Sequence, residues 1–137
     1  MKSYNQQYNY ASADSLSVLV ATRVRERMFA RFIAVFKPDT KDTILDIGVT
    51  AEQSYASSNY FESLYPFKNR LVACGIDDAH FLEEKYPGVA FCFADALNLP
   101  FSDYAFDFVH CSAVWEHIGS RENQQKMLAE GLRVARR

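Results

Sequence analysis

The hydrophobic residues between positions 15 and 36 recur every four residues, as they do along one face of an α-helix. This stripe comprises Leu16, Val20, Val24, Met28 and Phe32. The spacing predicts a helix that packs this face against a core. Asp14 or Ser15 can cap the start of this helix. Pro38 ends it, because a proline disfavours helical geometry at the residue that precedes it. The arginines of the segment fall mainly on the other side, so we expect them on a solvated face rather than a binding surface.

Four short apolar segments follow, at residues 43–49, 70–76, 89–94 and 106–113. Their apolar residues are continuous rather than alternating, which indicates strands buried on both faces. Helical patterns lie between and after them, at about residues 57–65, 79–86 and 122–136. Strands that alternate with helices predict an α/β fold with an open parallel sheet and right-handed crossovers.

Residues 1–13 are polar and tyrosine-rich, with no periodicity. We interpret them as an N-terminal tail, although the tyrosines could also form a flap over a pocket. Residues 14–137 contain no linker or internal repeat, which favours one domain of the folded, non-disordered class.

The formal net charge of −2 is unlike the basic excess of most nucleic-acid-binding proteins, so no nucleic-acid partner is expected. The N-terminus lacks a signal-peptide pattern, and no apolar run is long enough to span a membrane. The three cysteines have apolar neighbours and no metal-ligand spacing, which indicates reduced core residues and no metal site. These features favour a soluble, cytoplasmic protein without a membrane partner.

Acidic residues stand at the ends of three predicted strands: Asp46, Asp77 and Asp95. In an open α/β sheet, ligands bind beyond the carboxyl ends of the strands. Carboxylates at this rim can accept hydrogen bonds from a ribose diol or an exocyclic amine, as in an adenosine. The first strand is followed by a single glycine, Gly48, and no G-x-G-x-x-G motif, which argues against a pyrophosphate-containing dinucleotide.

Four segments lie at the ends of the predicted strands or run on from them, at residues 44–48, 75–77, 93–103 and 106–117. Together they resemble the motifs of class I S-adenosylmethionine-dependent methyltransferases, and in particular the type 11 group. Residues 44–48 (ILDIG) resemble the first motif, and residues 75–77 (GID) resemble the end of the second strand. Residues 93–96 (FADA) with 99–103 (LPFSD) resemble the third motif and its loop. Residues 106–117 resemble the fourth strand and the turn that follows. The order and spacing of the four segments carry the resemblance, which covers about residues 15–137.

The resemblance implies a Rossmann-like sheet with strand order 3-2-1-4, about four strands of the usual seven. It also implies roles for particular residues. Asp46 and Gly48 would lie by the methionine end of the cofactor, and Asp77 would accept from the ribose hydroxyls, with Asp78 as the alternative. Asp95 and the backbone of Ala96 would contact adenine, and Ser112 would lie near the reactive methyl group. His117 is the candidate for a general base.

Two departures from the family pattern bear on function. Val49 and Thr50 replace the second glycine of the first loop, so side chains there could crowd the cofactor's carboxylate, unless the loop is shaped differently. The chain also stops before the family's fifth strand, so we expect a C-terminally truncated domain. Its exposed sheet edge invites formation of a homo-oligomer.

The function expected from these features is methyl transfer from S-adenosylmethionine to an unidentified acceptor, most simply a small molecule. The alternative is a non-catalytic domain that binds an adenosyl ligand or a protein partner. A dinucleotide oxidoreductase is disfavoured by the glycine-poor loop.

Overall fold

The computed structural model describes residues 15–55 and 57–136. The proposed tail at residues 1–13 and the alternative cap Asp14 lie outside the described residues. Helix α1 (Leu16–Phe36) begins where Ser15 accepts a hydrogen bond from the Val18 N–H at 3.4 Å. It ends at Lys37, which adopts a left-handed conformation just before Pro38. The predicted start and end of the first helix are therefore confirmed.

The four predicted strands form one parallel sheet. They are β1 (Ile44–Ile47), β2 (Leu71–Gly75), β3 (Ala90–Phe93) and β4 (Phe108–Cys111). The spatial order is β3-β2-β1-β4, and every neighbouring pair is parallel. Ile44 is in register with Leu71 on one side and Phe108 on the other. The predicted fold class and strand order are thus confirmed, although the observed strands are shorter than the apolar segments.

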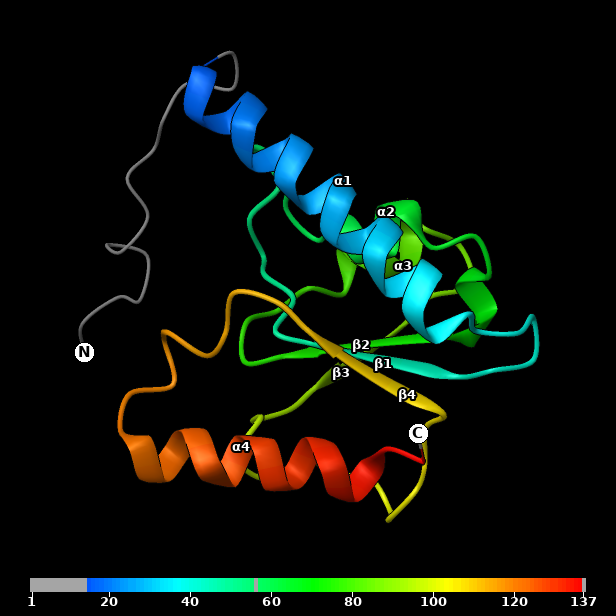
Figure 1. Cartoon of the computed structure of the whole chain (residues 1–137), viewed down its shortest axis with the longest axis vertical. Helices are drawn as coiled ribbons and strands as arrows, with labels where there is room; N and C mark the ends of the chain where they lie inside the picture. The colour runs from blue at the N-terminus through cyan, green and yellow to red at the C-terminus, as the bar shows by residue number, and fades with distance from the viewer. Residues whose placement is uncertain (1–14, 56, 137) are drawn as a thin grey trace.

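Helices cover both faces of the sheet (Figure 1). Helices α1, α2 (Tyr60–Leu64) and α3 (Phe81–Lys85) lie on one face, and α4 (Arg121–Val134) lies on the other. A 3-10 turn at Lys68–Arg70, which the sequence pattern did not indicate, leads into β2. Two clusters of buried side chains result. One centres on Phe61, Tyr65 and Leu71, and the other on Leu45, Ile47 and Met127. The central strands β1 and β2 are buried along almost their whole length, as continuous apolar strands require. The edge strands do not meet that expectation: both ends of β3 are exposed, and in β4 only Phe108 is buried.

The apolar stripe of α1 is mostly exposed, contrary to the sequence expectation. Only Phe32 of the stripe is buried, whereas Leu16 is 76% exposed and Val20 is 54% exposed. Figure 1 shows the reason: the C-terminal half of α1 crosses the sheet, and its N-terminal half extends beyond it. Periodicity identified an amphipathic helix but not the length that the core covers.

The cysteine prediction is confirmed only in part. All three are free thiols, and Cys74 is buried, but Cys92 is half-buried and Cys111 is exposed at the end of β4. None of the helices in the described ranges has the length and apolar character needed to cross a membrane.

Candidate functional site

A cavity of about 320 Å³ lies at the carboxyl ends of β1 and β4. The chain runs from β1 to β2 and β3 on one side and returns to β4 on the other, so this is the point where the strand order reverses. Open α/β sheets bind their ligands at such switch points. Four residues singled out from the sequence line the cavity: Asp46, Gly48, Ser112 and His117. Tertiary structure brings these residues together from positions more than sixty residues apart.

The other three predicted site residues do not line this cavity. Asp77 and Asp95 each lie two residues beyond the paired positions Gly75 and Phe93 of β2 and β3. Both are exposed. The Asp95 Oδ1 accepts from the Leu97 N–H at 2.8 Å, and Ala96 is buried in the second cluster. The predicted site therefore has two parts, a cavity beside β1 and β4 and an open rim beside β2 and β3.

Asp77 and its neighbour Asp78 have different surroundings. The Asp78 Oδ1 accepts from the His80 backbone N–H at 3.1 Å and lies 2.7 Å from His80 Nδ1. These contacts lower the pKa of Asp78, with the His80 side chain as the largest cause. No hydrogen bond connects the Asp77 carboxylate to another residue within 15–55 and 57–136. Of the two, Asp77 is the carboxylate available to a ligand.

The loop after β1 is held by hydrogen bonds instead of being shaped by several glycines. The backbone N–H groups of Gly48 and Val49 both donate to the Cys74 carbonyl, at 2.7 and 3.2 Å. The Thr50 N–H donates to Asn59 Oδ1 at 2.9 Å, and Asn59 Nδ2 donates back to the Thr50 carbonyl at 2.8 Å. The Val49 side chain is buried in the first cluster. Val49 and Thr50 nevertheless both line the cavity. Hydrogen bonds to Cys74 and Asn59, and not further glycines, fix the path of this loop.

Asp46 forms part of a buried polar chain that the sequence did not reveal. His110 Nδ1 lies 2.6 Å from Asp46 Oδ1, and His110 Nε2 lies 3.1 Å from the Tyr60 hydroxyl. Burial lowers the pKa of His110 to about 4, so the ring is neutral at physiological pH. A neutral ring has one donor and one acceptor. Nδ1 therefore donates to the carboxylate of Asp46, and Nε2 accepts from Tyr60.

Glu62 is a second buried carboxyl group beside Asp46. Its side chain is fully buried, and neither oxygen has a hydrogen-bond partner of good geometry among the described residues. Burial is the largest cause that raises the pKa of Glu62 well above its usual value, and the nearby Asp46 carboxylate is the next largest. Two adjacent carboxylates would repel each other, so one proton is retained by the pair and Glu62 is its neutral member. Phe61, the residue before it, stacks on the His110 ring at 4.3 Å.

Arg25 lines the cavity, contrary to the expectation that the arginines of α1 form a solvated face. Its Nη1 donates to the Ser57 carbonyl at 3.0 Å and lies 2.9 Å from the Ser57 hydroxyl. The helical pattern gave no signal for this role, because Arg25 and Ser57 are separated by 32 positions.

His117 lies at the cavity in the turn after β4, where its backbone N–H donates to the Val114 carbonyl at 2.9 Å. Ser112 lies beside the Tyr60 hydroxyl. Ala113, between β4 and this turn, has a φ of 57°. A left-handed conformation is uncommon at a non-glycine residue, and Lys37, Asn59 and Tyr104 also adopt it.

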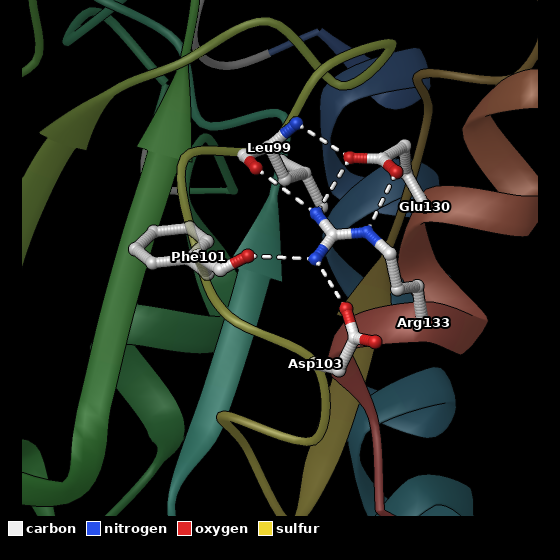
Figure 2. Close-up of polar contacts among 5 residues, drawn as sticks. All are labelled: Leu99, Phe101, Asp103, Glu130 and Arg133. Atoms are coloured by element: carbon white, nitrogen blue, oxygen red, sulfur yellow. Dashed lines mark hydrogen bonds and ion pairs between the residues drawn. The ribbon is translucent and has the colours of Figure 1, made fainter.

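The loop that carries Asp95 is fastened to α4 by Arg133 (Figure 2). The Arg133 guanidinium donates to the carbonyls of Leu99 and Phe101 at 3.0 and 2.7 Å, and to the Glu130 carboxylate at 2.8 Å. Glu130 in turn accepts from the Leu99 N–H at 2.8 Å. The hydrogen bonds from Arg133 lower the pKa of Glu130 to about 2, although burial acts to raise it. These bonds fix the β3–β4 connection and with it the rim beside β3.

An open parallel sheet with a cavity at its switch point and carboxylates beyond neighbouring strands defines a Rossmann-like domain. A family model described as a methyltransferase domain matches residues 45–137. The chain therefore belongs to the type 11 methyltransferase-domain family, and the resemblance seen in the sequence is confirmed.

Solved structures with the same fold have low sequence identity to this chain. An S-adenosylmethionine-dependent methyltransferase from Aquifex aeolicus is 20% identical with a TM-score of 0.60, over 89% of this chain and 63% of that one. One from Methanosarcina mazei is 22% identical with a TM-score of 0.55, over 76% and 52%. The [4+2]-cyclase SpnF is 19% identical with a TM-score of 0.61, over 93% and 45%.

Two further matching structures are a putative methyltransferase from Bacillus halodurans and the YcgJ protein from Bacillus subtilis. This chain covers 46% of the length of each. It thus spans about half the length of such relatives. A comparison with curated proteins finds no match in sequence.

Proposed function

We propose that this chain is the cofactor-binding part of an S-adenosylmethionine-dependent methyltransferase that acts on a small-molecule acceptor in the cytoplasm. The observation that carries the proposal is the arrangement of the site along one rim. A cavity bordered by Asp46, Gly48 and Ser112 lies beside β1 and β4, and the Asp77 and Asp95 carboxylates lie beside β2 and β3. An elongated ligand with an adenosine at one end and an amino acid at the other suits this layout.

The residues present fit such a cofactor in two respects. Asp77 offers an exposed carboxylate without a hydrogen-bond partner among the described residues, as binding of a ribose diol requires. Asp95 Oδ1 is engaged by Leu97, which orients the carboxyl group and leaves its second oxygen for an adenine amino group. The cavity of about 320 Å³ is large enough for the methionine portion.

S-adenosylmethionine supplies a methyl group on a sulfonium, which is already a good leaving group. The protein's contribution is therefore mainly to hold the two reactants in line. Ser112 and His117 lie where the acceptor would approach. We propose His117 as the residue that takes a proton from the acceptor when the nucleophile carries one. Asp46 holds His110 and, through it, Tyr60 at the cavity wall, so its role is to position the site.

A non-catalytic adenosyl-binding domain would have the same cofactor site, and the structural likeness to the [4+2]-cyclase SpnF shows that one fold serves more than one reaction. Binding and chemistry are therefore tested separately. Thermal shift with S-adenosylhomocysteine and with NAD tests the cofactor class. Incorporation of a labelled methyl group, measured over a panel of small-molecule acceptors with a lengthened chain, tests the reaction. Stabilisation by NAD alone would overturn the proposal.

The sharpest test of the ribose site is Asp77→Ala. It should weaken S-adenosylhomocysteine binding by about 1.5–3 kcal/mol, the range for a hydrogen bond to a charged group. The matched control is Glu84→Ala, which removes an exposed carboxylate from α3 and should leave affinity unchanged. Calorimetry that finds the same affinity for Asp77→Ala and the wild type would move the ribose role elsewhere, with Asp78 the next residue to substitute.

A further inference from the structure

The backbone of the loop after β1 has few N–H groups left for a ligand. Gly48 and Val49 both donate to the Cys74 carbonyl, and Thr50 donates to Asn59. The Glu52 N–H donates to the Thr50 hydroxyl at 3.2 Å, and the Ser54 N–H donates to the Glu52 carboxylate. A backbone donor that already has a partner gains little from a second acceptor. An anionic group at this end of the cavity therefore has to be bound by a side chain.

Among the described residues that line the cavity, Arg25 alone carries a permanent positive charge. Its Nη1 is anchored on the carbonyl and hydroxyl oxygens of Ser57. The other guanidinium nitrogens, Nε and Nη2, have no hydrogen-bond partner within the ranges that the structure describes. Anchoring at one nitrogen fixes the plane of the group, and the planar fork of arginine matches a carboxylate through two parallel bonds.

The same cavity also carries negative charge. Glu52 lines the cavity. The side chain of Ser54 is the largest cause that lowers the pKa of Glu52, and the Ser54 backbone N–H is the next largest. Glu52 is therefore ionised at neutral pH. A cation contributed by α1 and an anion contributed by the loop after β1 face one cavity. Such a pair complements a ligand that carries both a carboxylate and an ammonium group, which is the charge pattern of an α-amino acid.

We infer that Arg25 binds the α-carboxylate of the cofactor's amino-acid portion and thereby replaces the backbone donors of a glycine-rich loop. This inference rests on the proposed function, because it assigns a residue to one end of the same ligand. Arg25 then determines specificity: it favours ligands that retain the amino acid over nucleosides that lack it.

Two ligands that differ in the amino-acid portion test the inference. S-adenosylhomocysteine carries the carboxylate, and 5′-methylthioadenosine has the same adenosine and sulfur without it. Calorimetry with the Arg25→Gln variant should show S-adenosylhomocysteine affinity lowered by about 10- to 150-fold, the equivalent of one lost hydrogen bond between charged groups. Binding of 5′-methylthioadenosine should stay within about twofold of the wild type. Arg25→Lys keeps the charge but not the fork and should show an intermediate loss.

Arg31→Gln is the matched control, because Arg31 is exposed on the same helix and should bind both ligands like the wild type. Far-UV circular dichroism and the urea midpoint establish that each variant is folded. Equal losses for both ligands in Arg25→Gln, or no loss for either, would overturn the role of Arg25 while leaving the proposed function in place. A wild-type chain that binds neither ligand would overturn the proposed function itself, and the inference with it.

Discussion

Replacement of Gly48 by alanine tests whether the turn after β1 has the geometry described here. Gly48 has a φ of +98°, and a Cβ added to it would lie 1.9 Å from Val114 Cγ2 and 3.3 Å from Val114 Cβ. Val114 packs against the second buried cluster, so it cannot move away freely. The substitution therefore has two separate costs, a backbone conformation that alanine disfavours and a steric overlap.

Their sizes follow from the geometry. A residue with a Cβ in the left-handed region costs about 1–2 kcal/mol, and insertion of a methyl group into packed side chains costs about 1–3 kcal/mol. Gly48→Ala should therefore lower the free energy of unfolding by about 2–5 kcal/mol. A typical domain has a total of only about 5–15 kcal/mol, so the variant should be measurably destabilised or largely unfolded.

Val114→Ala separates the two costs. It removes the overlapping methyl group and leaves the backbone conformation unchanged. The double variant should therefore be more stable than the sum of the single effects predicts, by about 1–3 kcal/mol. Urea unfolding at a single protein concentration measures this, followed by far-UV circular dichroism and by the fluorescence of Trp115, the single tryptophan. Gly48→Ala within about 0.5 kcal/mol of the wild type, or strictly additive effects, would refute the proposed geometry.

Two further predictions concern pH and association. The folded chain holds the Glu62 proton more tightly than the unfolded chain does, because the pKa of Glu62 is raised in the folded state. The stability that this proton contributes is complete below the unfolded pKa of 4.5 and is lost as the pH rises toward the folded pKa. Glu62→Gln should therefore make the free energy of unfolding fall less steeply with rising pH. Urea unfolding of the wild type and the variant between about pH 5 and 8 measures this pH dependence. The two slopes should differ by at most about 1.4 kcal/mol per pH unit, the value for one proton. Identical slopes would contradict a protonated Glu62. The second prediction is that the 137-residue chain self-associates through the edge of β4 that faces away from β1. Among the described residues this edge is paired only just before β4, where Phe106 bridges to Ala135. It lies beside an apolar cavity of about 290 Å³ and the exposed side chains of Leu128 and Leu132. Light scattering reports this, Leu132→Glu should reduce it, and a strictly monomeric wild type over a wide concentration range would argue against it.

The sequence by itself determined the alternation of strands and helices, the fold class, and the carboxylates that follow the strands. These features are local: a continuous apolar segment marks a buried strand, and the residue after it lies at the rim. The strand order came from the family resemblance, and the structure confirmed it. The assignments of Asp46, Gly48, Asp77, Asp95, Ala96 and Ser112 to a cofactor, and of His117 to catalysis, stay predictions, because they depend on a bound ligand.

Only the tertiary structure decided which side chains share a site. His110 meets Asp46 across 64 positions, and Arg25 meets Ser57 across 32, distances over which periodicity carries no information. The sequence also placed the stripe of α1 in the core, whereas the helix crosses the sheet only with its C-terminal half. Amphipathicity is a property of one helix, but burial depends on where neighbouring elements end. For the same reason Glu62, a charged residue in a short helix, gave no sign that it lies buried beside Asp46.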